Sequence, residues 1–310
     1  MNSEVVTSTL ERLKKDSLKS ALEINTSVRR ILAETLIKRG FLEAPPVIFS
    51  IVTDPLNHPV YDPSFLYEDF RYSLTKSMIF HKQILVQEIP KFFIFSPNIR
   101  LETPDKASSG RHLLEFTQLD LEVKGAHREE LMDLAEDLII ETFRYVTREN
   151  HATLSKMGRR LNIPGKPFKS YRYLDLLEKY GEDFEARMSR EAREPFWIID
   201  IPLESREFYD REKDDEPGIL RDMDLIYPEG FGEALSGGER EFKIERIRER
   251  ILKKGQTFDQ FHWFLEIAEE GMELSTGFGI GIERLVRYIC GFSRIEDVHP
   301  FPKVPGRLSL

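Results

Sequence analysis

Two segments in which polar and apolar residues alternate place the strongest constraint on how this chain folds. Every second residue is polar in 95–102 and in 118–123, and the residues between them are apolar. A period of two predicts β-strands whose side chains point alternately to two faces. The connecting TPDKASSGRHLL is rich in turn formers, so the two segments predict an antiparallel hairpin with a long loop and one polar face. The polar positions are Ser96, Asn98, Arg100, Glu102, Gln118, Asp120 and Glu122, and Phe116 has the same parity.

The segments outside this hairpin predict helices and short strands in irregular order. The first forty residues predict two helices, the second with Val28, Ile31, Leu32 and Leu36 on one face and an end near Gly40. The paired prolines of FLEAPPVIFS predict an extended edge segment. Residues 150–195 predict a helical insertion, and FWIIDIPL, REFYDRE and DMDLIYPEG predict short strands. This order favours an α+β fold with an antiparallel sheet flanked by helices over a doubly wound parallel sheet, in a single domain over 1–310.

Composition limits the classes of protein that this chain can represent. The 310 residues are 40% hydrophobic and 32% charged, as in an ordinary globular enzyme. No run of about 18 apolar residues and no signal-peptide core occurs, so we expect a cytoplasmic protein without a membrane span. The net charge of −9 argues against nucleic acid as the main partner. The single cysteine, Cys290, excludes an internal disulfide, and it falls on an apolar helical stripe that predicts a core position.

Several residue groups have the chemistry of a nucleotide site. Arginine offers a planar fork of donors to phosphate, so Arg100 with Glu102 is a candidate pair. GFGIGIER places three glycines before Arg284 at the start of a helix, a pattern that lets a backbone approach an anion. The oxygen ligands of Asp224, Glu233 and Ser236 suit magnesium. The cations Lys82 and Arg240 suit a carboxylate.

Each of these groups also has a purely structural explanation when taken alone. A cross-strand salt bridge accounts for the R-x-E pair, close packing of a strand against a helix accounts for the glycines, and solvation accounts for the surface charges. P-loop, serine-hydrolase, zinc-protease and kinase signatures do not occur in the sequence. The order of the groups along the chain is therefore more informative than any single one.

In that order, the groups resemble the three motifs of class II aminoacyl-tRNA synthetases. The helix ending at Gly40 with FLEAPP resembles motif 1, with Pro46 as its proline. NIRLE and GRHLLEFTQLDLE, with the loop between them, resemble motif 2, and GFGIGIERL resembles motif 3. SMIFHKQ, RHLLEFTQLD and SGGER resemble the aspartyl/asparaginyl group. The resemblance runs from about residue 23 to the end of the chain.

This resemblance implies a role for each candidate residue. Arg100 would hold the α-phosphate of ATP, Glu102 would contact the adenine end, and Phe116 would stack on the base. His112 would contact the outer phosphates, and Arg284 would clamp the γ-phosphate. Asp224, Glu233 and Ser236 would hold Mg²⁺, with Asp224 and Glu233 farther apart in sequence than the family spacing. Lys82 and Arg240 resemble the pair that reads the aspartate side-chain carboxylate, and Ser77 and Gln118 would line the amino-acid pocket.

Only some twenty residues precede the motif 1 region, too few for an OB-fold anticodon-binding domain of about 100 residues. The arrangement resembles the archaeal asparagine synthetases related to asparaginyl-tRNA synthetase. That resemblance implies an ammonia-dependent, AMP-forming aspartate–ammonia ligase that works through an aspartyl-adenylate. We accordingly expect ATP, L-aspartate and ammonia as substrates, a homodimer, and no tRNA partner.

Several alternatives stay open from the sequence. The chain can instead be a paralogue that aminoacylates tRNA or another acceptor, including a protein lysine, or a non-catalytic regulatory paralogue. The sequence does not decide which aspartate carboxylate Lys82 and Arg240 hold. A general base for ammonium is expected, but no residue is identified for it.

Overall fold

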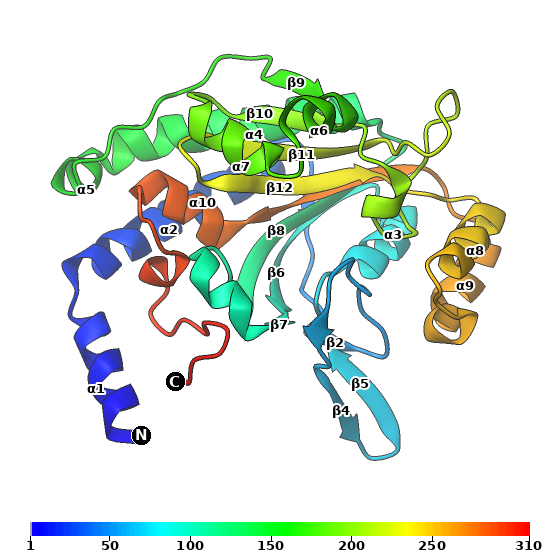
Figure 1. Cartoon of the computed structure of the whole chain (residues 1–310), viewed down its shortest axis with the longest axis horizontal. Helices are drawn as coiled ribbons and strands as arrows, with labels where there is room; N and C mark the ends of the chain where they lie inside the picture. The colour runs from blue at the N-terminus through cyan, green and yellow to red at the C-terminus, as the bar shows by residue number, and fades with distance from the viewer. Residues whose placement is uncertain (1) are drawn as a thin grey trace.

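The computed structural model describes residues 2–310, and its elements follow the irregular order that the sequence predicts (Figure 1). The α-helices are α1 (Asn2–Leu13), α2 (Asp16–Lys38), α3 (Ile79–Glu88), α4 (Arg128–Glu149), α5 (His151–Lys156), α6 (Tyr173–Tyr180), α7 (Phe184–Glu191), α8 (Ile244–Lys253), α9 (His262–Glu269) and α10 (Ile282–Cys290). Four 3-10 helices are η1 (Pro104–Ser109), η2 (Leu203–Ser205), η3 (Phe258–Phe261) and η4 (Ile295–Val298). The strands are β1 (Leu42–Glu43), β2 (Phe49–Ser50), β3 (Val60–Tyr61), β4 (Ser64–Tyr67), β5 (Phe70–Leu74), β6 (Lys91–Ile99), β7 (Leu101–Glu102), β8 (Glu115–Lys124), β9 (Lys169–Arg172), β10 (Phe196–Ile199), β11 (Asp222–Tyr227), β12 (Gly232–Glu239) and β13 (Ser275–Gly281).

An eight-stranded sheet in the order β1-β6-β8-β13-β12-β11-β10-β9 forms the centre of the molecule. The six central strands pair with one another in antiparallel orientation, and the edge strands β1 and β9 are parallel to their neighbours β6 and β10. The predicted hairpin is confirmed as the pair β6–β8, in which Ser96 faces Gln118. The segment with two prolines lies at the edge of the sheet as predicted, since β1 is the last strand on that side.

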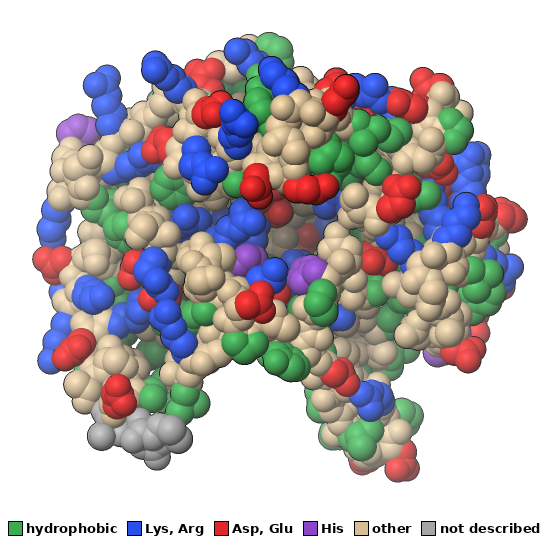
Figure 2. Space-filling model, in the orientation of Figure 1, with side chains coloured by type: hydrophobic (Ala, Val, Ile, Leu, Met, Phe, Trp, Pro, Cys, Tyr) green, Lys and Arg blue, Asp and Glu red, His purple; other side chains and the backbone are tan. Residues whose placement is uncertain are grey.

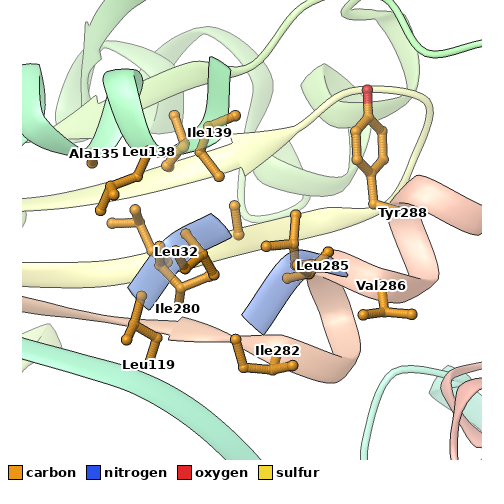
Figure 3. Close-up of a cluster of buried hydrophobic side chains, with 14 of the residues drawn as sticks. Leu32, Leu119, Ala135, Leu138, Ile139, Ile280, Ile282, Leu285, Val286 and Tyr288 are labelled. Atoms are coloured by element: carbon orange, nitrogen blue, oxygen red, sulfur yellow. The ribbon is translucent and has the colours of Figure 1, made fainter. Parts of the chain in front are cut away.

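One face of this sheet and three helices enclose the main hydrophobic core. The apolar positions of β8 and β13, among them Leu119 and Ile280, point to the side where α2, α4 and α10 pack (Figure 3). Leu32 of α2 and Leu138 of α4 are buried in the same cluster. Cys290 is also part of it, and burial raises the pKa of its thiol to about 12, so the prediction of a core cysteine is confirmed.

A second, smaller core supports the elements at the opposite side of the sheet. It joins α3 and α9 through stacked and edge-on aromatic rings, with Phe80 and Phe208 5.7 Å apart and Phe208 and Phe261 4.8 Å apart, and α8 adds Ile247 and Ile251 to the same cluster. This cluster anchors α3 and the segment around Phe208 beside the polar face of the sheet. The hairpin of β4 and β5 projects away from the body next to α3 (Figure 1).

Two sequence expectations need adjustment. REFYDRE was expected to be a strand, but in the described chain it contributes only isolated bridges, Asp210 to Arg240 and Glu212 to Leu220. Its Phe208 is held in the second core, so the segment follows that cluster and not the ladder of the sheet. Residues 150–195 contain the helices α5, α6 and α7 but also the edge strand β9. None of the helices in residues 2–310 is long and apolar enough to cross a bilayer.

Candidate active site

The polar face of the sheet forms the floor of a charged cleft of about 320 Å³. Figure 2 shows the hollow near the middle of the molecule, with basic, acidic and histidine side chains around it. The floor comes from neighbouring strands, because Gln118 faces Gly281 and Asp120 faces Gly279 in the register of β8 and β13. On the next strand, Ser236 faces Gly279 in turn. The polar face predicted for β6 and β8 thus extends over the neighbouring strands β13 and β12.

The glycines of β13 leave room for the polar side chains of β8 next to the β13 backbone. A Cβ atom added to Gly277 would lie 1.9 Å from Oε2 of Glu122, and one added to Gly279 would lie 2.8 Å from the amide nitrogen of Gln118. Gly281 has more room, since its nearest neighbour would be Cδ of Arg284 at 3.5 Å. The polar side chains of β8 therefore lie over the backbone of β13, which requires glycine most strictly at position 277.

Two cations converge on one carboxylate at the inner end of the cleft. Lys82 of α3 donates to Asp120 at 2.8 Å, and its Nζ lies 3.9 Å from Oε2 of Glu122. Arg240, which follows β12, donates to the same Oε2 at 3.4 Å and to Oε1 at 3.0 Å. It also donates to Asp210 at 2.9 Å. Lys82 and Arg240 are only 3% and 4% exposed, so their positive charges are fixed in place by buried carboxylates.

The other part of the cleft contains two more arginines. The guanidinium of Arg100 lies over the ring of Phe116, 5.2 Å from its centroid, and its Nε donates to the carbonyl of Lys76 at 3.0 Å. Arg284, in the first turn of α10, donates to Glu233 at 2.8 Å. These residues come from motifs far apart in the sequence, and the sheet brings them to one cavity wall.

His112 also faces this part of the cleft, from the loop between β7 and β8. Its Nδ1 lies 2.6 Å from the hydroxyl of Ser109. Burial, and then the charges of Arg284 and Arg111, lower the pKa of its imidazole to about 4. The ring is therefore neutral near pH 7 and can meet a phosphate only as a hydrogen-bond donor.

Three carboxylate oxygens around the cleft have no hydrogen-bond partner among residues 2–310. They are Oε2 of Glu102, Oδ2 of Asp120 and Oδ1 of Asp224. The other oxygen of Glu102 lies 3.1 Å from Nε2 of His58. Buried polar atoms in native proteins are nearly always paired, and a concentration of unpaired ones in a cleft is typical of a ligand site.

Asp224, Glu233 and Ser236 lie together where β11 and β12 pair. Asp224 faces Ser236 in the register, and an irregularity between Leu225 and Ile226 accommodates the longer spacing to Glu233. Burial raises the pKa of Asp224, whereas the charge of Arg284 holds the pKa of Glu233 below its ordinary value despite burial. Arg206 also donates to Asp224 at 2.6 Å. Two carboxylates beside a polar cavity fit Mg²⁺, which commonly takes its other ligands from phosphates and water.

The structure brings the sequence-predicted site residues to one place. All of them line the cleft except Asp224, which faces Ser236 on the neighbouring strand. The sequence reasoning missed several other lining residues. The position of Arg111 next to His112 was a sequence signal for Arg111. The residues of the segment 206–210 had no such signal, since that segment was predicted only as a strand. Among the missed residues are Asp54, His58, Arg111, Glu185, Arg206, Glu207, Tyr209 and Asp210.

Comparison with known proteins assigns the family. Residues 4–305 match the family of tRNA synthetases class II (D, K and N). The chain belongs to this family.

The relatives of this class II protein are named as tRNA ligases. The chain is 30% identical to an asparagine–tRNA ligase of Lawsonia intracellularis over 77% of its own length and 57% of that protein. It is 28% identical to an aspartate–tRNA(Asp/Asn) ligase of Sulfurisphaera tokodaii, over 96% of this chain and 71% of that one. A crystal structure of asparaginyl-tRNA synthetase from Pyrococcus horikoshii complexed with asparaginyl-adenylate has the same fold, with a TM-score of 0.87, 23% identity, and coverage of 96% and 71%.

Glu283, the neighbour of Arg284 in motif 3, gives this class II protein a testable pH dependence. Both of its carboxylate oxygens accept from the backbone N–H of Thr117, at 3.1 and 3.0 Å. Burial raises the pKa of its carboxyl from 4.5 to about 7, and these hydrogen bonds offset only part of the rise. The folded state then binds this proton more tightly than the unfolded chain. Its contribution to stability is complete below about pH 4.5 and is lost as the pH rises through about 7.

We therefore expect the Glu283→Gln variant to lose this part of the pH dependence. The free energy of unfolding, from urea denaturation at about pH 5 and about pH 8, should fall less with pH in the variant than in the wild type. Glu178→Gln, at an exposed position of α6, is the control and should follow the wild type. If the free energy of unfolding changed equally with pH in the wild type and in Glu283→Gln, the raised pKa of Glu283 would be contradicted.

Proposed function

We propose that this protein is an AMP-forming asparagine synthetase. It would convert ATP, L-aspartate and ammonia to L-asparagine, AMP and diphosphate through an aspartyl-adenylate. The observation that carries the proposal is the pair Lys82 and Arg240, two buried cations that share one oxygen of Glu122 at the inner end of the cleft. A substrate with two carboxylates can place one against this pair while the other reaches the end of the cleft that holds Arg100.

The residues of the outer end support adenylation of that second carboxylate. Arg100 would hold the α-phosphate, and its electrostatic effect grows as negative charge develops during attack on phosphorus. Arg284 would bind the γ-phosphate, with His112 donating a hydrogen bond to the outer phosphates. Phe116 would stack on the adenine and Glu102 would accept from it through its unpaired oxygen. Ser77 and Gln118 would border the amino acid.

The proposed product determines the orientation of aspartate in the cleft. For asparagine to form, the side-chain carboxylate of aspartate must be the one that is activated. Lys82 and Arg240 would then hold the α-carboxylate. Fixing carboxylate and α-phosphate in line supplies a large part of the rate increase, because the reaction becomes effectively intramolecular. Asp224, Glu233 and Ser236 would hold Mg²⁺, which when bound neutralises phosphate charge.

The proposal is tested by incubating the protein with ATP, Mg²⁺ and L-aspartate, with and without ammonium chloride. We expect asparagine and AMP in equal amounts, and only with ammonium. Glutamine should not replace ammonium, since Cys290, the single cysteine, lies in the core and away from the cleft. Pyrophosphate exchange with aspartate but without asparagine would contradict the proposed acceptor and leave aspartate activation in place.

A second candidate is aminoacylation of tRNA, and the names of the relatives favour it. The chain spans 57% and 58% of the length of two asparagine–tRNA ligases that it matches. AMP release that depends on tRNA and not on ammonium would identify this activity. Absence of any nucleotide turnover would identify a non-catalytic paralogue. A homodimer in solution, measured by light scattering, is expected from either catalytic activity.

A further inference from the structure

We propose that Arg206 closes the candidate metal site to a free divalent cation, so that Mg²⁺ enters the cleft only together with ATP. The inference rests on the proposed function, which places Mg²⁺ at Asp224, Glu233 and Ser236. It adds to that function a residue from outside the three motifs, and it names the ligand that this site accepts, a complex of nucleotide and metal.

Two aspartates of one strand hold Arg206 at the border of the cleft. Its Nε donates to Oδ2 of Asp222 at 2.9 Å, and a terminal nitrogen donates to Oδ2 of Asp224 at 2.6 Å. Asp222 is only 1% exposed, and its Oδ1 accepts from the backbone N–H of Ile201 at 3.0 Å. Positions 222 and 224 share one face of β11, since side chains alternate along a strand. The guanidinium is therefore fixed on Asp224 by a second, buried carboxylate.

Each of the two candidate metal carboxylates is thus already paired with an arginine. Arg206 takes one oxygen of Asp224, and Arg284 donates to Oε1 of Glu233 at 2.8 Å. Oδ1 of Asp224 is buried and has no partner among residues 2–310. Within the same residues, no group of three or more His, Cys, Asp or Glu side chains could hold a metal ion. Since Mg²⁺ demands near-octahedral coordination, the described side chains alone offer too few ligands.

The charges around Glu233 also disfavour a free divalent cation. The arginines whose charges act on it are Arg284, Arg206, Arg100 and Arg111. The carboxylates of the same group are Glu233 itself, Asp224 and Glu185, which interact with one another, and Asp222, which shares Arg206. Arginines and carboxylates balance in this group. It therefore has no surplus of negative charge that would attract Mg²⁺ from solution.

ATP changes this balance in two ways. Its phosphates bring negative charge and oxygen ligands to the site, and phosphates commonly supply part of the Mg²⁺ shell in proteins. In the proposed placement, its γ-phosphate also takes Arg284 away from Glu233 and frees that carboxylate. Arg206 stays on Asp224, because two aspartates hold it from the protein side. Asp224 then has only Oδ1 to offer to a metal.

The test measures the binding of Mn²⁺, a paramagnetic substitute for Mg²⁺, by the loss of the free-ion signal in electron paramagnetic resonance. The full chain is titrated with Mn²⁺ alone and with Mn²⁺ plus α,β-methylene-ATP, in which the bond that adenylation breaks is replaced. Arg206→Gln removes the charge but keeps N–H donors for the aspartates, and Arg206→Lys keeps the charge. Arg211→Gln is the matched control, because Arg211 is a half-buried arginine of the same segment that pairs with the buried Glu239 and does not line the cleft.

For the wild type, we expect Mn²⁺ to bind at least about tenfold more tightly with the nucleotide analogue than alone. In Arg206→Gln, the Kd for Mn²⁺ alone should fall by about tenfold or more, because a unit positive charge next to the site is removed. The fall should be smaller with the analogue, since the triphosphate then supplies most of the attraction. Arg206→Lys and Arg211→Gln should bind Mn²⁺ alone as weakly as the wild type does.

Two results would overturn the proposal. One is a wild-type protein that binds Mn²⁺ equally tightly with and without the analogue, a result that needs no variant to fold. The other is an Arg206→Gln protein that unfolds cooperatively in urea, and is therefore folded, but binds Mn²⁺ alone no more tightly than the wild type. Arg206 would then only orient Asp224.

The titrations contain no aspartate, ammonium or tRNA, so their result is separate from the choice of acceptor. If the wild type forms no asparagine, the proposed function fails and the result for Arg206 stands. If the wild type binds no Mn²⁺ even with the analogue, the placement of the metal fails and this inference fails with it.

Discussion

Replacing Arg100 with alanine should lower the rate of aspartate-dependent ATP–pyrophosphate exchange by about 100- to 1,000-fold. The guanidinium lies beside Phe116 in the outer part of the cleft, where we place the α-phosphate. Loss of a fixed electrostatic contact to a developing charge typically has an effect of about this size. The change should appear mainly in kcat, because the contact strengthens as the reaction proceeds.

Two further variants show whether the effect belongs to this guanidinium. Arg100→Lys keeps the charge but loses the planar fork, so it should recover only part of the rate. Arg144→Ala removes an exposed arginine that pairs with Glu141 on the same helix, and it should leave exchange unchanged. An Arg100→Ala protein that is folded and exchanges within about threefold of wild type would refute the placement of the α-phosphate.

Gly277→Ala is expected to have the second large effect, on stability and on the cleft together. The added Cβ would lie 1.9 Å from Oε2 of Glu122 and 2.3 Å from the backbone oxygen of Leu121. Overpacking of this kind destabilises by about 1–3 kcal/mol or more. It would also displace the carboxylate that positions Lys82 and Arg240. We expect a lower free energy of unfolding in urea and a higher KM for aspartate.

Gly281→Ala is the matched control for Gly277→Ala. It makes the same change on the same face of β13, where the new atom would be 3.5 Å from the flexible side chain of Arg284. Its stability should remain within about 0.5 kcal/mol of wild type. The structural account of the glycines would be wrong if the two variants were destabilised equally.

The sequence predicted best those features that depend on local periodicity. The hairpin β6–β8, the two N-terminal helices and the core position of Cys290 each follow from a repeat of two or 3.6 residues. The α+β class also follows, because it needs only the order of the elements. The candidate residues of the three motifs were found through a resemblance, and the sheet brings them to one cleft.

The parts that the sequence did not predict depend on contacts between distant segments. Glu207 and Asp210 belong to the cleft only because Phe208 is inserted into a core built from α3, α8 and α9. No periodicity within REFYDRE shows this insertion. In the same way, Glu185 comes from α7 and reaches Arg111 at 3.5 Å from a helix that looked like a polar insertion. Such side chains are placed by tertiary packing, for which a single sequence has no local signal.

The packing of α2, α4 and α10 on one face of the large sheet has a consequence for how such a protein can diverge. The side chains that fill the core and those that face the cleft alternate along the same strands, yet they lie on opposite sides of the backbone. A polar exchange at Gln118 or Ser236 alters what the cleft recognises without opening a void in the core. Changes of substrate on this scaffold therefore need few mutations and few further mutations to restore stability. Activity can in this way evolve separately from folding.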